Sequence, residues 1–327
     1  MPDLKTQLYQ MFILGTEGGN YVQALKNGLG GVIFFTRDIQ SGEQFKTLIN
    51  NIKKEAIIPP FLSIDQEGGR VERTENIHNG KKYLSAKYAY EKGDKFLEKQ
   101  TRQIAQELKS YGINLNFAPC IDVNTNPDNP IIGERAFSSN PDDVIKAEKI
   151  VTKTYKENGI LPCVKHFPGH GDANADSHLT LPKIDLSLQK MEQTHIKPFK
   201  SAVENGIDMV MVAHLHCTCF EKESVPTSLS KNAIDYLRNE LRFDGIAISD
   251  DMVMKGVADF GEVEACIMGI KAGLNMFIYR TSDENTIKLI EKVYKIAKSD
   301  KFLQKNIENS YEKIIDFKEN NPNIFVI

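Results

Sequence analysis

The segment from Lys165 to Pro182, KHFPGHGDANADSHLTLP, carries residues whose types and spacing suit acid/base chemistry. Asp176 precedes His178 by two residues, and at that spacing a carboxylate can fix the tautomer of an imidazole and stabilise the imidazolium. An Asp-x-His triplet is also common in polar turns, so the pair alone leaves both interpretations open. The glycines and the proline predict a loop with unusual backbone angles and freedom to move.

Polar residues that are uncommon in strands follow four apolar runs of the chain. They are Asp65 at the start of DQEGGRVER, Lys165 with His166, His214 with His216, and Asp250 with Asp251 after Ser249. In a parallel barrel the strand ends and the loops after them form the catalytic face. Each position alone could be an ordinary turn or a satisfied core residue, and Lys165 could pair with a buried acid such as Asp65. Their recurrence on several strands favours a catalytic face.

Eight short apolar runs are predicted to be the strands that position these residues. They are residues 11–14, 32–35, 61–64, 113–117, 161–165, 209–213, 245–249 and 274–279. Most are continuously apolar, which is typical of parallel strands covered on both faces.

Segments with helical periodicity lie between these strands. Residues 97–111 have their apolar positions on one face and are followed by Gly112, a typical left-handed stop. Asn140 and Pro141 predict a helix start, with Gly159 as its end, and Ser230 caps another helix. Residues 284–298 and 307–317 are the last two helix candidates. The alternation predicts one α/β domain over residues 1–327, a (β/α)₈ TIM-type barrel, although periodicity alone leaves a doubly wound open sheet possible.

Composition restricts the class of protein. The 327 residues are 41% hydrophobic with a net charge of -3, so the chain can bury a large core and has no basic excess for nucleic acid or a membrane surface. No apolar run approaches the roughly 20 residues of a membrane span, and we identify no secretion signal. Five cysteines, mostly within apolar stretches, suit buried thiols in a reducing compartment. We therefore expect a cytoplasmic, monomeric protein without a cofactor.

Taken together, the motifs resemble glycoside hydrolase family 3. The resemblance covers KHFPGHGDANADSH, DQEGGRVER upstream and AISDDMVM downstream, with GINLNFAPCIDVN and IIGERAF between them. More narrowly, the chain resembles the β-N-acetylglucosaminidase branch that acts in bacterial peptidoglycan recycling. The resemblance implies a retaining exo-enzyme that removes terminal, non-reducing N-acetylglucosamine from muropeptides such as GlcNAc-anhydro-MurNAc. Family 3 enzymes of other sugar specificity remain an alternative.

The resemblance also implies roles for individual residues. It makes Asp250 the nucleophile, His178 the acid/base and Asp176 the partner of that histidine. It assigns the binding of the terminal sugar to a further set: Asp65, Arg73, Arg135, Lys165 and His166. Ala136 departs from the family, where serine is expected in the Arg-Ser-Phe motif. The chemistry is consistent, because glycoside cleavage needs an anion on one face of the sugar and a proton donor at the leaving oxygen.

Two other classes of function remain open on the sequence. A metal-dependent barrel hydrolase would use His214, His216, Asp250 and Lys165. The spacing His214-x-His216-Cys217-x-Cys219 is, however, tight for a four-ligand zinc site, because neighbouring strand residues face opposite ways. We therefore predict no metal, and the role of this motif stays open. A sugar-binding module with an inactive site is the non-enzymatic alternative, and the intact Asp250, Asp176 and His178 argue against it.

Overall fold

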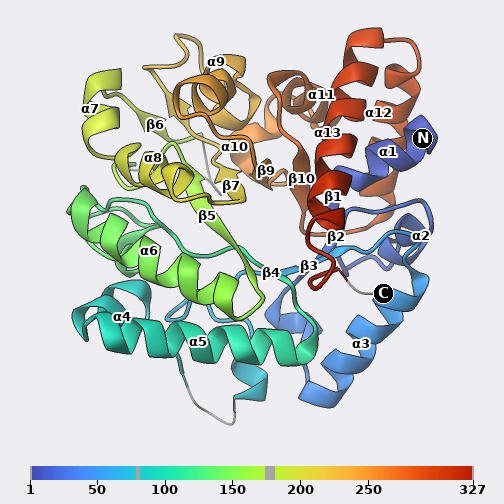
Figure 1. Cartoon of the computed structure of the whole chain (residues 1–327). Helices are drawn as coiled ribbons and strands as arrows, with labels where there is room; N and C mark the ends of the chain where they lie inside the picture. The colour runs from blue at the N-terminus through green and yellow to red at the C-terminus, as the bar shows by residue number, and fades with distance from the viewer. Residues whose placement is uncertain (1, 79–81, 174–180, 326–327) are drawn as a thin grey trace.

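The computed structural model describes residues 2–78, 82–173 and 181–325. Over these residues, eight parallel strands close into a barrel in the order β1-β10-β9-β7-β5-β4-β3-β2 (Figure 1). The strands are β1 (Phe12–Gly15), β2 (Gly31–Phe34), β3 (Phe61–Ile64), β4 (Leu115–Asn116), β5 (Leu161–Phe167), β7 (Met209–Val212), β9 (Ile246–Asp251) and β10 (Met276–Tyr279). Closure between β1 and β10 confirms the predicted barrel and excludes the open sheet.

Helices surround the barrel and cover the outer face of the strands (Figure 1). They are α1 (Leu4–Gln10), α2 (Tyr21–Lys26), α3 (Gly42–Glu55), α4 (Ala86–Glu91), α5 (Asp94–Tyr111), α6 (Pro141–Glu157), α7 (Leu188–Gln193), α8 (Lys197–Glu204), α9 (Lys231–Asp235), α10 (Lys255–Ala258), α11 (Glu262–Ala272), α12 (Glu284–Ala297) and α13 (Lys301–Glu319). Most barrel strands are buried at every position, which explains their continuously apolar sequences. None of the described helices is both long and apolar enough to cross a bilayer.

The helix ends follow the local sequence signals. Gly112 ends α5 at φ 94°, in the left-handed region that glycine enters without a Cβ penalty. The Asn140 side chain caps α6 by accepting a hydrogen bond of 2.9 Å from the Asp142 amide, and Pro141 occupies the first turn. Ser230 caps α9 in the same way through the Ala233 amide. The helix after Ser230 departs from the expected form, because α9 continues as a π-helical turn over Tyr236–Glu240.

A second, two-stranded sheet lies outside the barrel. It pairs β6 (Lys183–Ile184) with β8 (His216–Cys217) in parallel. Each strand has only two residues, too short for a periodic pattern, so the sequence did not indicate them. Four of the five cysteines are buried and all five are free thiols, which agrees with the buried thiols expected from the sequence.

Candidate active site

A cavity of about 480 Å³ opens at the carboxyl ends of the barrel strands. Its walls come from the ends of six strands or the loops after them, through Phe35, Asp65, Lys165, Met211, Asp250 and Arg280. Six of the residues assigned from the sequence line it together: Asp65, Arg73, Arg135, Lys165, His166 and Asp250. Asp176 and His178 lie outside the described residues. The polar residues predicted at the strand ends therefore meet in one cavity, which gathers side chains from distant parts of the chain.

Lys165 is the buried cation at the floor of this cavity. Its Nζ lies 2.7 Å from Asp65 Oδ1 and 2.7 Å from Glu67 Oε1, and its side chain is 2% exposed. Burial opposes the charge, but the two carboxylates outweigh it and raise the pKa of Lys165 above its usual range. The pairing of Lys165 with Asp65 foreseen from the sequence is thus present, and it lies within the cavity.

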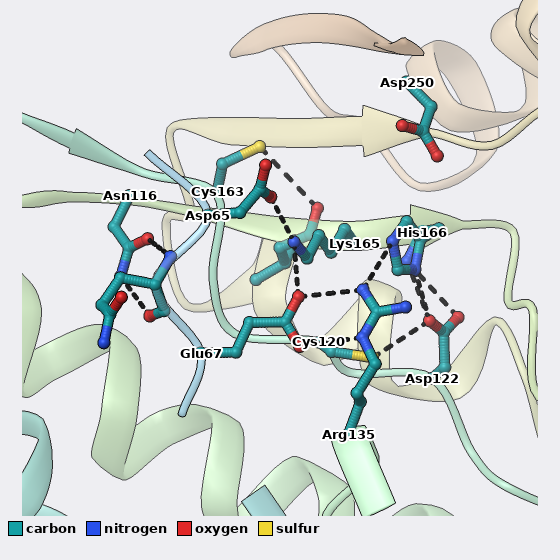
Figure 2. A network of polar contacts seen from close by, with 12 residues as sticks. Asp65, Glu67, Asn116, Cys120, Asp122, Arg135, Cys163, Lys165, His166 and Asp250 are labelled. Carbon is teal, nitrogen blue, oxygen red and sulfur yellow. Dashed lines mark hydrogen bonds and ion pairs between the residues drawn. The ribbon is translucent and has the colours of Figure 1, made fainter. Parts of the chain in front are cut away.

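Arg135 joins this lysine cluster to His166. Its Nε and Nη2 donate to the two oxygens of Glu67, each at 2.9 Å, in a bidentate pair (Figure 2). The same Nη2 lies 3.3 Å from Nε2 of His166. Burial disfavours the charge of Glu67, but Arg135 and Lys165 lower its pKa well below the usual range. Glu67, which the sequence placed only within a loop motif, is therefore the anion shared by two sugar-binding candidates.

Lys165 and His166 both reach the cavity although they are neighbours in β5. The pairing of β5 with β7 shifts register between Val164 and Phe167, and such an irregularity re-aims side chains that would otherwise alternate. The peptide bond between Lys165 and His166 is cis. The apolar pattern predicts a strand that ends at Lys165. It contains no sign of the register shift, because the register depends on the neighbouring strand β7.

Asp122 is a functional candidate that the sequence analysis did not single out. It is fully buried in the segment after β4, and its Oδ2 lies 2.6 Å from Nδ1 of His166 (Figure 2). Burial opposes its charge, but His166 and then His170 hold the pKa of Asp122 well below its usual range. The signal that was available is modest: an acid two residues after Cys120 in an otherwise apolar run past a strand end.

The loop from Asp65 to Arg73 is held rigidly by Gln66. Its backbone amide donates to Asn116 on β4 at 2.9 Å, and its side-chain oxygen accepts from the Arg73 amide at 2.7 Å. Gly68 adopts φ 94° against the Leu84 carbonyl oxygen, where a Cβ would clash. Arg73 packs over the Phe35 ring at 5.9 Å, and its Nε is buried with no hydrogen-bond partner among the described residues.

Asp250 is the next-to-last residue of β9 and lies beside the cavity. Burial disfavours its charge, but His166, His214 and the Asp251 amide lower its pKa, so it is a carboxylate at neutral pH. Figure 2 shows its carboxylate directed toward the side of the polar network that carries His166, with no dashed line to the residues drawn. Asp251 instead pairs with Arg280 and accepts from the Val253 amide at 3.1 Å.

The His214-to-Cys219 motif has protein partners in this structure. His214 Nδ1 lies 2.7 Å from Ser228 Oγ and its Nε2 lies 3.2 Å from the Asp251 carbonyl oxygen. His216 is on β8, with Nε2 3.0 Å from the Glu221 carbonyl oxygen. Ala136, the other departure from the family, packs in a small buried cluster with Cys120, Ile131 and Ile132. His214 supports the end of β9, whereas His216 belongs to the small sheet.

The arrangement combines a carboxylate nucleophile candidate with a rigid set of donors and acceptors. Asp65, Lys165, Arg73 and Arg135 can bind several hydroxyl or carbonyl oxygens of a small polar ligand. Asp250 lies beside them, is ionised, and forms no ion pair with another of the described residues. Such a site can hold a polyhydroxylated ring and present an anion to one of its faces.

Comparisons with known proteins agree with this geometry. Residues 5–317 match the family model described as the glycosyl hydrolase family 3 N terminal domain. The chain is 33% identical over 322 residues to beta-hexosaminidase A of Pseudoalteromonas piscicida, which covers 90% of this chain and 54% of that protein. It is 31% identical over 269 residues to a beta-hexosaminidase of Idiomarina loihiensis, covering 80% of each chain. The chain thus spans about half the length of the first relative and most of the second.

Among solved structures, the chain is similar to the family 3 beta-N-acetylglucosaminidase from Paenibacillus sp. str. FPU-7. The TM-score is 0.92 with 28% sequence identity, and the alignment covers 98% of this chain and 63% of that one. The similarity therefore extends across nearly the whole barrel.

Proposed function

The chain belongs to glycosyl hydrolase family 3, and from that premise we propose that it is a retaining exo-β-N-acetylglucosaminidase. Its substrate would be a small carbohydrate with a terminal, non-reducing N-acetylglucosamine, of the kind found in peptidoglycan-derived muropeptides. Residues 1–327 would form its single catalytic domain. The names of the relatives support the reaction class, and the cavity at the carboxyl end of the barrel supports a ligand of sugar size.

The observation that carries the proposal is the position of Asp250. It is an ionised carboxylate at the end of β9, and it lines the same cavity as Asp65, Lys165 and Arg135. In the proposed reaction an Asp250 oxygen attacks the anomeric carbon while the bond to the leaving oxygen breaks, which forms a glycosyl-enzyme ester. Water then attacks the same carbon and releases the sugar and the free carboxylate.

We assign the binding of the terminal sugar to five residues that line the cavity: Asp65, Arg73, Arg135, Lys165 and His166. Asp65 accepts hydrogen bonds from hydroxyl groups, while the cations donate to hydroxyl or acetamido oxygens. The ion pairs of Lys165 and Arg135 fix these donors before the sugar arrives, which lowers the entropic cost of binding.

His178 is proposed as the acid that protonates the leaving oxygen and then as the base that activates water, with Asp176 as its partner. His178→Ala should slow a natural disaccharide far more than a dinitrophenyl glycoside, because a good leaving group needs little protonation. Azide should rescue breakdown of the intermediate, since it attacks the anomeric carbon without a base and releases a glycosyl azide and the free carboxylate. Equal losses on both substrates, with no effect of azide, would assign the proton transfer to another group.

The proposed reaction is tested by hydrolysis of 4-nitrophenyl N-acetyl-β-glucosaminide. Asp250→Ala should lose nearly all turnover while it keeps its fold, because the nucleophile is removed at a strand end. Asp244→Ala is the matched control, since exposed Asp244 lies just before the other end of β9 and pairs only with half-buried Lys313 in the described contacts. Activity in wild type and Asp244→Ala, without activity in Asp250→Ala, supports the proposal. Equal activity in all three would overturn it.

A further inference from the structure

Asp122 collects hydrogen bonds from three neighbouring residues. Its oxygens accept from the His170 amide at 2.6 Å, from the His166 amide at 3.3 Å and from the Cys120 thiol at 3.2 Å, in addition to the contact with His166 Nδ1. Several donors around one buried carboxylate stabilise its ionised form, as its lowered pKa reflects. Asp122 is therefore a fixed buried anion directly behind His166.

The partners of His166 determine which of its nitrogens carries the proton. A guanidinium has only donors, so the 3.3 Å contact between Arg135 Nη2 and His166 Nε2 is a hydrogen bond when Nε2 is unprotonated and its lone pair is free to accept. The proton of the neutral ring must then be on Nδ1, where the 2.6 Å contact to ionised Asp122 accepts it. Both ring nitrogens are thereby assigned by chemistry alone.

We infer that Asp122 is a positioning residue: it holds His166 as the Nδ1–H tautomer, and His166 in turn orients the Arg135 guanidinium toward the sugar. Without Asp122 the His166 ring can take the Nε2–H form. Its Nε2–H then faces an N–H of Arg135, and two donors cannot form a hydrogen bond with each other. Glu67 would then be the remaining anchor on the far side of that guanidinium. The orientation of Arg135 toward a sugar rests on the proposed function, whereas the tautomer of His166 is independent of it.

A metal ion is the competing explanation for this cluster, because atoms of Cys120, Asp122 and His166 lie within 4.8 Å of one another. Thiolate is the form of cysteine that binds metals, yet burial and then Asp122 raise the pKa of the Cys120 thiol far above its usual range. The thiol is also already a donor to Asp122. The geometry of the cluster fits a hydrogen-bonded anion better than an open ligand set.

The tautomer can be measured directly by ¹⁵N NMR of protein labelled at histidine, with His166→Gln used to assign the signal. The unprotonated imidazole nitrogen resonates far from the protonated one, so the two forms are distinct. Wild type should show His166 with a proton on Nδ1 and none on Nε2. A proton on Nε2 at neutral pH would overturn the inference, and this arm needs neither turnover nor an Asp122 variant.

The kinetic arm uses Asp122→Asn, with Cys120→Ala as the matched control. Asp122→Asn should lose the single Nδ1–H form and raise KM by about 10- to 100-fold, by analogy with the loss of outer partners of metal-bound histidines. The change in kcat should be smaller, because the group affected binds sugar in the ground state as well as the transition state. Cys120→Ala removes one donor to Asp122 but keeps the His166 contact, so its tautomer and KM should match wild type.

Two results separate this inference from the proposed function. An unchanged tautomer together with an unchanged KM in Asp122→Asn would overturn the positioning role, whatever the enzyme hydrolyses. A protein with the expected tautomer that hydrolyses no N-acetylglucosaminide would contradict the proposed function and support the assignment of His166.

Discussion

Lys165 compensates the negative charges of Asp65 and Glu67 in the cavity. It is the buried cation between Asp65 and Glu67, and Glu67 is shared with Arg135. A buried ion pair contributes little net stability, but removal of one partner leaves a charge without compensation and is strongly destabilising. Lys165 therefore affects both the fold of the site and the binding of the ligand.

We expect Lys165→Met to weaken binding of the terminal sugar by ~2–5 kcal/mol, partly because Asp65 loses its cation. The unfolding temperature should fall as well. Lys146→Met is the control, since Lys146 forms an exposed ion pair of 2.8 Å with Asp94 far from the site, and both quantities should stay as in wild type. Steady-state kinetics and thermal unfolding give the two readouts. Unchanged KM and kcat in Lys165→Met would show that the lysine does not contribute to the site.

The residues of the cavity and its supports differ in how well the sequence predicts their place. Asp65, Lys165 and Asp250 follow apolar runs, so their place on the catalytic face could be predicted from the pattern. Glu67 and Asp122 could not be assigned, because their roles depend on which cation or imidazole the fold brings to them. The sequence shows no contact between Asp122 and His166, which are separated by 44 positions.

Helix α6 shows how an element can bury a group that the function does not use. Glu148 lies on its inner face near α8, is 1% exposed, and accepts a hydrogen bond of 3.1 Å from Thr152 Oγ1. Its Oε2 is buried without a partner among the described residues. Burial raises the pKa of Glu148 to about 7, because the low-dielectric surroundings disfavour the carboxylate.

This carboxyl group predicts a pH-dependent stability. Between about pH 4.5 and 7 the unfolded chain loses the Glu148 proton while the folded chain keeps it. The free energy of unfolding therefore falls as the pH rises through this range. Above pH 7 the full cost of burying the Glu148 carboxylate remains. Glu148→Gln should therefore gain about 3 kcal/mol at pH 8 and nothing near pH 4, relative to wild type.

Denaturant unfolding across this pH range measures the effect, with Glu157→Gln as the control from the exposed face of the same helix. The control should follow the wild-type pH profile. A gain in Glu148→Gln that is the same at pH 4 and pH 8 would show that the carboxyl group does not titrate in this window.

The elements themselves could be predicted well where their sequence pattern is long. All eight barrel strands were located to within three residues at each end, and Asn140, Gly112 and Ser230 mark helix boundaries as expected. The pattern fails where contacts between elements decide the conformation. The two-residue strands β6 and β8 depend on each other, and the π-helical turn after α9 has no compositional signal.

At the scale of the whole molecule, the two ends of the barrel have different chemistry. The carboxyl end holds the charged cavity, whereas Lys318 of α13 fills the amino end. Its Nζ donates to Gln10 Oε1 at 3.0 Å and lies 4.8 Å from the centre of the Phe61 ring. Burial lowers the pKa of Lys318 to about 7. The candidate site and the buried Lys318 thus lie at opposite ends of the barrel, and the carboxyl end is the usual place for an active site in this architecture.

The alternation of strands and helices favoured a barrel, but closure and strand order could not be read from it. Periodicity describes each element against water and core, and an open sheet satisfies it equally well. Closure follows from the pairing of β1 with β10, residues that lie at opposite ends of the chain. The order of the motifs, rather than their periodicity, indicated the family and with it the barrel.

As the proposed nucleophile, Asp250 should form a covalent bond to the sugar during turnover. Trapping of this glycosyl-enzyme is a direct test of its role. A 5-fluoro N-acetylglucosaminide, or a 2-deoxy-2-fluoro glucoside in which fluorine replaces the acetamido group, forms the glycosyl-enzyme when it carries a good leaving group, and its hydrolysis is slow, so the ester accumulates. Digestion and mass spectrometry then locate the added sugar. We expect one label per chain, on the peptide that contains Asp250 and on that side chain. A label on Asp251 or Asp65, or inactivation without a covalent adduct, would contradict it.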